Sequence, residues 1–149
     1  MPKPYVFRLE ENKAIVRKMI EAFNRRNFAI VDELTAPDFI EHTHRYKGRE
    51  ANKQFLNMHV KGFPDFNMAI EEIIAEGDNV WVRFKVTGTH TGEFHGLTPT
   101  GAKVTFASVQ MYRIVDGKIA ECWAVSDSAE FLRQLGVMEY TEKAKKFFP

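Results

Sequence analysis

Asp127, near the C-terminus, is the strongest candidate for chemistry in this sequence. It lies four residues after Trp123, and we expect Phe106 and Trp123 to surround it with apolar rings. A carboxyl group in such surroundings can remove a proton next to a carbonyl and return it elsewhere, because desolvation raises the pKa of an acid. A structural role competes with this interpretation, since Ser126-Asp127-Ser128 also suits the N-cap of a helix.

Two histidines are candidates to assist that aspartate. His42 and His44 lie two residues apart in a segment that reads as extended, so their side chains are predicted to share one face. Imidazole titrates near neutrality, and we interpret His42 as a second catalytic residue that helps to move the proton. The alternative is one buried, hydrogen-bonded histidine and one surface histidine.

His90 lies between two glycines, Gly88 and Gly92, in a loop or at a strand end. It is a candidate for contact with a substrate, although a hydrogen bond to the turn backbone explains it equally well. A metal site built from His42 and His44 with His90 or His95 lacks a carboxylate at a recognisable spacing. We therefore expect no metal.

Aromatic and hydrogen-bonding residues of the predicted strands are candidates for the wall of a ligand pocket. Trp81 and Arg83 share one strand face, where the guanidinium could bind an acidic or enolate oxygen. A half-exposed sheet face or a dimer contact explains this pair as well. The remaining substrate-binding candidates are Phe94, Phe106, Gln110, Tyr112 and Trp123.

These residues need a scaffold, and the hydrophobic periodicity changes halfway along the chain. Apolar residues at helical spacing predict helices in the first half, and alternating residues predict antiparallel strands in the second. The order of these elements indicates an α+β fold, in which helices pack on a curved sheet. The expected helices are 10–24, 28–34, 49–61 and 128–135, and the expected strands are 68–75, 80–89, 104–115 and 118–125.

The dipeptide Asp116-Gly117 suits a two-residue hairpin turn and sets the register of the last two predicted strands. An uninterrupted ladder from that turn pairs Tyr112 with Glu121 and Gln110 with Trp123. One face would then carry Phe106, Ser108, Gln110, Tyr112, Glu121, Trp123 and Asp127. The opposite, apolar face would carry Ala107, Val109, Met111, Ala120, Cys122 and Ala124.

Length and composition limit the class of protein. A chain of 149 residues suits a single domain spanning 1–149. Its 21 basic and 20 acidic residues leave a formal charge of +1, which argues against a nucleic-acid partner. No apolar run approaches the ~20 residues of a membrane span, and the N-terminus lacks a signal-peptide pattern. We therefore expect a soluble, cytoplasmic protein without a membrane partner.

Several short motifs, in one consistent order from about residue 10 to 136, resemble the SnoaL-like polyketide cyclase family of the NTF2-like superfamily. Each fragment is weak alone, and the ordered set is specific for the family. The matching pieces are Ala22-Phe23-Asn24, the stretches 36–42, 62–65, 75–78, 88–94, 99–101 and 116–119, and Trp123 with Asp127.

The resemblance implies a cone-shaped α+β barrel, usually dimeric, with a hydrophobic pocket. It also implies ring closure of a hydrophobic carbonyl compound by intramolecular aldol condensation, without metal or cofactor, and with Asp127 as general acid/base. Cys122 departs from the family pattern, because relatives often carry histidine before this tryptophan. A non-catalytic binding or dimerisation module, and an isomerase of the ketosteroid isomerase type, are the alternative functions.

Overall fold

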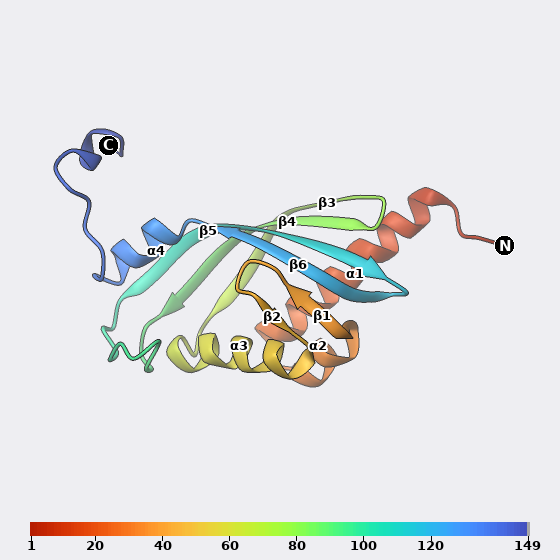
Figure 1. Cartoon of the computed structure of the whole chain (residues 1–149), viewed down its shortest axis with the longest axis horizontal. Helices are drawn as coiled ribbons and strands as arrows, with labels where there is room; N and C mark the ends of the chain where they lie inside the picture. Colours follow the sequence, from red (N-terminus) through yellow and green to blue (C-terminus); the bar gives the residue numbers. More distant parts are fainter. Residues whose placement is uncertain (149) are drawn as a thin grey trace.

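The helices and the sheet form separate layers in the computed structural model, which describes residues 1–148 (Figure 1). Three helices, α1, α2 and α3, lie against one side of a curved sheet, and α4 follows its last strand. The helices are α1 (Tyr5–Asn24), α2 (Phe28–Leu34), α3 (Arg49–Gly62) and α4 (Ser128–Gln134), with a short 3-10 turn at Ala144–Lys146. The predicted α+β class is therefore confirmed.

The sheet has six strands in the order β2-β1-β6-β5-β4-β3. All neighbouring pairs are antiparallel except β1 with β6. The strands are β1 (Thr35–Glu41), β2 (Tyr46–Lys47), β3 (Asn67–Glu76), β4 (Asn79–Thr89), β5 (Lys103–Val115) and β6 (Lys118–Ser126). Long antiparallel strands twist strongly, and the resulting curvature lets the sheet wrap around the helices.

The core lies between the concave face of the sheet and the buried side of α1. Alternate residues of β4, Val80, Val82, Phe84 and Val86, are fully or almost fully buried. On α1, Val16, Ile20 and Phe23 are buried at helical spacing. This packing holds the strands that carry the candidate site residues.

The hairpin between β5 and β6 corrects the predicted register. Asp116 and Gly117 both have positive φ, as a type I′ turn requires, and Ile114 pairs with Ile119 as expected. One step further Arg113 pairs with Glu121, so a β-bulge leaves Ala120 without a partner.

Because side chains alternate along a strand, this one extra residue moves the rest of β6 to the opposite face. Tyr112 pairs with Cys122 instead of Glu121, and Gln110 pairs with Ala124 instead of Trp123. The predicted face that grouped Glu121 and Trp123 with Tyr112 was therefore wrong. Cys122 and Ala124 lie on the concave side with Gln110 and Tyr112, and Trp123 lies on the convex side.

Candidate functional site

A hollow opens between the helices and the concave face of the sheet, and it has two connected lobes. The inner lobe, of about 80 Å³, is lined by residues from α1, α3, β1, β5 and β6. The outer lobe, of about 340 Å³, extends toward α4 and is within the usual size range of ligand pockets. Both lobes are lined by Phe23, His44, Phe55, Leu56, Met68, Gln110 and Ala124.

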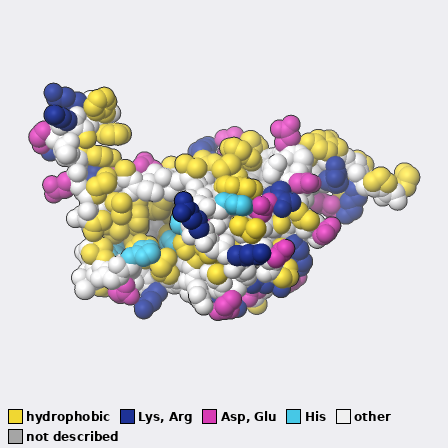
Figure 2. All heavy atoms as spheres, in the orientation of Figure 1, with side chains coloured by type: hydrophobic (Ala, Val, Ile, Leu, Met, Phe, Trp, Pro, Cys, Tyr) yellow, Lys and Arg dark blue, Asp and Glu magenta, His cyan; other side chains and the backbone are white. Residues whose placement is uncertain are grey.

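Aromatic rings dominate the walls of the outer lobe. Phe106 of β5 and Phe131 of α4 have ring centroids 4.9 Å apart, and Phe94 approaches Phe131 edge to face at 6.1 Å. Figure 2 shows this hollow as a depression with largely hydrophobic walls and histidines at its edge. Such walls suit a flat, apolar ligand with few polar groups.

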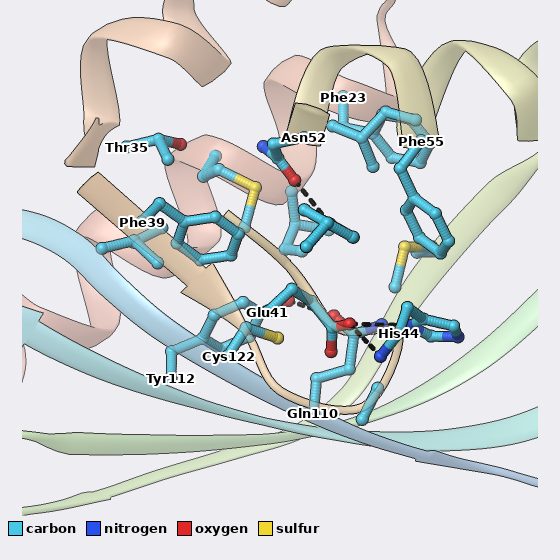
Figure 3. A pocket seen from close by; sticks show the side chains of 17 residues that line it. Phe23, Thr35, Phe39, Glu41, His44, Asn52, Phe55, Gln110, Tyr112 and Cys122 are labelled. Carbon is cyan, nitrogen blue, oxygen red and sulfur yellow. Dashed lines mark hydrogen bonds and ion pairs between the residues drawn. The ribbon is translucent and has the colours of Figure 1, made fainter. Parts of the chain in front are cut away.

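Glu41 is the last residue of β1. Among the described residues, it is the one acidic residue that lines either lobe. Its side chain is only 4% exposed. Its carboxylate accepts hydrogen bonds from the backbone N–H of Thr43 at 3.1 Å and from that of His44. It also contacts the ring Nδ1 of His44 at 2.9 Å (Figure 3). These donors compensate the burial of a charged group.

His44 lies where the two lobes meet. Its ring packs on Phe55 of α3 with centroids 4.6 Å apart, while 47% of its side chain stays exposed. No hydrogen bond reaches its Nε2 from residues 1–148. The ring therefore has one nitrogen tied to Glu41 and one available at the hollow.

Two tyrosines add hydroxyl groups to the inner lobe. Tyr46 donates to Asn52 Oδ1 at 2.8 Å, and the Tyr112 hydroxyl donates to Gln110 Oε1. Burial raises the pKa of both tyrosines well above its usual value, so both remain protonated donors. Because Gln110 accepts through its oxygen, its amide N–H groups are left without a hydrogen-bond partner among residues 1–148.

Burial shifts the pKa of two further residues of the lining, His59 and Cys122. Burial lowers the pKa of His59, whose Nδ1 donates to the carbonyl of Phe55 at 2.9 Å. His59 lies in the wall of the outer lobe. Burial raises the pKa of the Cys122 thiol, so this cysteine remains a neutral part of the inner-lobe wall.

Four of the sequence-predicted substrate-binding residues line the hollow. Phe94 and Phe106 belong to the outer lobe, Tyr112 belongs to the inner lobe, and Gln110 belongs to both. Periodicity found the β5 residues, because Phe106, Gln110 and Tyr112 alternate toward the concave face.

Trp81, Arg83 and Trp123 lie on the convex face, away from the hollow. In the ladder of strands Trp81 pairs with Met111, and Met111 pairs with Trp123. Arg83 binds the carboxylates of Glu71 and Glu72 on neighbouring β3. These three side chains contribute to an outer surface that includes exposed apolar groups.

His42 and His44 lie on opposite sides of the sheet, which corrects their predicted common face. The strand ends at Glu41 and the chain turns, with Arg45 at a positive φ of 61°. The His42 ring stacks on Trp123 with centroids 4.4 Å apart, and its Nε2 contacts Glu121 at 2.9 Å. Alternation applies only within a strand, so it fails in this turn.

Asp127 caps α4. Its Oδ1 accepts the backbone N–H of Glu130 at 3.2 Å, and the residue is exposed. Its neighbours Ser126 and Ser128 line the outer lobe, and Asp127 itself does not belong to the lining.

His90 is fully buried beneath the loop that follows β4, and it does not belong to the lining of either lobe. Its Nδ1 accepts the backbone N–H of Thr100 at 3.2 Å, and its ring stacks on Phe63. This is the local hydrogen bond that the alternative interpretation of His90 expected.

No three histidine, cysteine, aspartate or glutamate side chains of residues 1–148 come together as a metal site would require. None of the helices in the same range is long and apolar enough to cross a bilayer.

A curved, mostly antiparallel sheet and helices that together enclose an apolar hollow define an NTF2-like fold. The model of the SnoaL-like polyketide cyclase family matches residues 13–135, and this chain belongs to that family. The resemblance stated from the sequence motifs is therefore confirmed.

The relatives carry names of polyketide cyclases. Aklanonic acid methyl ester cyclase DauD of Streptomyces sp. (strain C5) is 32% identical over 82% of this chain and 80% of its own. The nogalonic acid methyl ester cyclase of Streptomyces nogalater is 32% identical over 79% and 92%. These relatives support a cyclase-type function.

One similar solved structure has a different name. AclR of Streptomyces galilaeus, described as a "putative hydroxylase", superposes with a TM-score of 0.81 at 32% identity, covering 95% of each chain. Its identity to this chain equals that of the cyclases, so overall similarity does not separate the two reactions.

Proposed function

We propose that this protein closes a ring in a hydrophobic carbonyl compound by intramolecular aldol condensation. The observation that carries the proposal is the hollow itself, whose aromatic walls enclose ligand-sized space with polar groups gathered where the lobes meet. The names of the 32% identical relatives support methyl esters of polyketide acids as the substrate class.

The reaction needs a base, an oxygen-binding donor and a return of the proton. A proton leaves the carbon beside one carbonyl, that carbon bonds to a second carbonyl carbon, and the new alkoxide takes up a proton. The product of this addition is an isomer of the substrate, so the step is redox-neutral and calls for no cofactor. The free amide N–H groups of Gln110 would stabilise the enolate or alkoxide oxygen.

Asp127 is proposed as a general acid/base of this reaction. Its place in the resemblance, four residues after Trp123, supports the assignment, as does its position in the chain between two serines of the outer-lobe lining. From there it would exchange protons with a ligand that extends out of the hollow. The helix cap that it forms is a second, independent use of the same carboxylate.

Asp127→Asn separates these two uses, because asparagine caps helices as well as aspartate does but transfers no proton. With aklanonic acid methyl ester and nogalonic acid methyl ester as substrates, we expect a fall in kcat of ~10²–10⁴-fold with an unchanged Tm. Asp127→Ala should lose the cap too and cost about 1 kcal/mol of stability. Wild-type rates in the asparagine variant would leave Asp127 with capping alone.

The convex face supports a separate proposal, a homodimer. Ile74, Trp81 and Val125 are exposed there beside Trp123, an arrangement more typical of an interaction surface than of a solvated one. In this proposal Trp81, Arg83 and Trp123 contact a second copy of the chain, and His42 supports Trp123 by stacking.

AclR favours a second reaction, hydroxylation of a similar compound. Mass spectrometry of the product separates the candidates, because aldol addition leaves the mass unchanged and hydroxylation adds one oxygen atom. A ligand that binds and is recovered unchanged would indicate the non-catalytic binding module. A product with a moved double bond and no new ring would indicate an isomerase.

A further inference from the structure

Glu41 and His44 form a hydrogen-bonded pair in the hollow, and the proposed reaction assigns no role to either residue. Among the described residues, both lobes together contain one acidic side chain, Glu41, and it is buried. Its Oε2 lies 2.9 Å from His44 Nδ1. A buried carboxylate in contact with a partly open imidazole is an arrangement suited to proton transfer.

The hydrogen bonds determine which nitrogen of His44 can act. A carboxylate only accepts hydrogen bonds, so Nδ1 must carry the proton in this contact. In the neutral ring the lone pair is then on Nε2, for which residues 1–148 supply no partner. Glu41 is itself held by the backbone N–H groups of Thr43 and His44, which keeps this geometry in place.

We propose that His44 is the catalytic base of the ring closure and that Glu41 positions the His44 ring. This inference rests on the proposed function. Nε2 would take the proton from the carbon beside the substrate carbonyl, and the electron pair of that C–H bond would form the new C–C bond. Glu41 would stabilise the imidazolium, Asp127 in its acid form would give a proton to the new alkoxide, and the imidazolium would return one proton to Asp127 through water. Atoms and charge balance without an added reagent.

The location of His44 indicates the part of the substrate on which it acts. The ring packs on Phe55 at the junction of the lobes, next to Gln110. A flat substrate lying along the aromatic outer lobe would bring one end to this junction. The substrate class is therefore an apolar ring system that carries, at one end, a carbonyl group with a C–H bond beside it.

His44→Gln tests the base directly. The two methyl esters are incubated with the enzyme in D₂O, and both deuterium uptake and ring closure are followed by mass spectrometry and NMR. We expect both rates to fall by ~10²–10⁴-fold while the Tm stays unchanged. His42→Gln is made in parallel, and a larger loss in that variant than in His44→Gln would overturn the proposal.

The positioning role of Glu41 has its own readout. In ¹⁵N NMR of the wild-type protein we expect the neutral His44 ring to carry its proton on Nδ1, and the other tautomer would overturn the role. Glu41→Gln should lower kcat by ~10-fold to ~10⁴-fold and shift the acidic limb of the pH–rate profile to lower pH, with KM little changed. Glu41→Asp should restore part of the rate, and Glu10→Gln, on the surface of α1, is the matched control.

The experiments distinguish a failure of this inference from a failure of the proposed function. If the wild type neither exchanges deuterium nor closes a ring with either ester, the proposed function fails and the role of His44 fails with it. If the wild type is active and His44→Gln retains its rate, the inference alone is overturned. Should His44→Gln fold poorly, His44→Gly with added imidazole replaces it: recovered rate supports the proposal, and no recovery in a folded variant contradicts it.

Discussion

Two histidine–glutamate pairs lie on opposite faces of the same sheet, and they differ in what surrounds them. His44 contacts Glu41 at 2.9 Å on the concave side, and His42 contacts Glu121 at 2.9 Å on the convex side. Distance therefore does not distinguish them. Glu41 is 4% exposed and has backbone donors, whereas Glu121 is 18% exposed and also binds Arg113.

The location of the free ring nitrogen is the more important difference. His42 uses Nε2 for Glu121 and stacks flat on Trp123. His44 uses Nδ1 for Glu41 and keeps Nε2 at the junction of the two lobes. A catalytic histidine needs a nitrogen that reaches a substrate, so the comparison favours His44 and assigns His42 to the outer surface.

The largest expected effect is a loss of stability, and it tests which face of β4 is buried. Phe84 on the concave side is fully buried, while Trp81 on the convex side is 47% exposed. We expect Phe84→Ala to lower the free energy of unfolding by about 3–5 kcal/mol, because a cavity replaces a large core side chain. Trp81→Ala should cost about 1 kcal/mol or less within one chain. Urea titrations of both variants measure this, and equal losses would contradict the assignment of faces.

The convex face should instead control self-association. Trp81→Glu places a charge in the exposed apolar surface, and we expect the dissociation constant of the proposed homodimer to rise by about 30-fold or more, as for an interface hot spot. Sedimentation velocity over a dilution series gives the constant. Lys85→Glu, on the same face of β4 and further from Trp123, is the matched control. A wild-type protein that is monomeric throughout the series would refute the homodimer.

The smallest effects compare the pH dependence of the two sides. Burial lowers the pKa of His59 in the hollow, so the folded state resists protonation and loses stability as the pH falls below about 6.5. On the convex side, hydrogen bonds from Arg113 and His42 lower the pKa of Glu121, so stability is lost at lower pH, below its usual value of 4.5. Tm measured against pH should flatten near pH 6 in His59→Gln and near pH 4 in Glu121→Gln. A flattening near pH 4 in His59→Gln and near pH 6 in Glu121→Gln would contradict the assignment of these two pH ranges to the two residues.

Much of the fold could be predicted because each element carries its own local signal. Phe28–Leu34 was predicted with the bounds that the structure has, and the other predicted helices and strands differ by a few residues at most ends, whereas β1 and β2 were not among the predicted strands. The start of α1 was missed by five residues, because the stretch before Glu10 lacks a one-sided apolar pattern. The Asp116-Gly117 turn was also predicted correctly, since its backbone conformation favours these residue types.

The candidate site was predicted less well, and two local events explain why. The bulge at Ala120 moved Trp123 away from the hollow, and the turn after Glu41 separated His42 from His44. Neither event leaves a signal in residue type. Glu41 was missed because a glutamate at a strand end is usually exposed, and its residue type gives no sign that it is buried here.

From its amino-acid sequence alone this protein is a SnoaL-like α+β chain with four helices and a long β-hairpin, because period and turn chemistry are local properties. Which histidine meets the hollow was decided only by tertiary structure. A shift of one residue in a strand reverses every side chain beyond it, and such a shift costs little locally while changing all the contacts across the sheet. The proposed base therefore became visible only once the strands were paired.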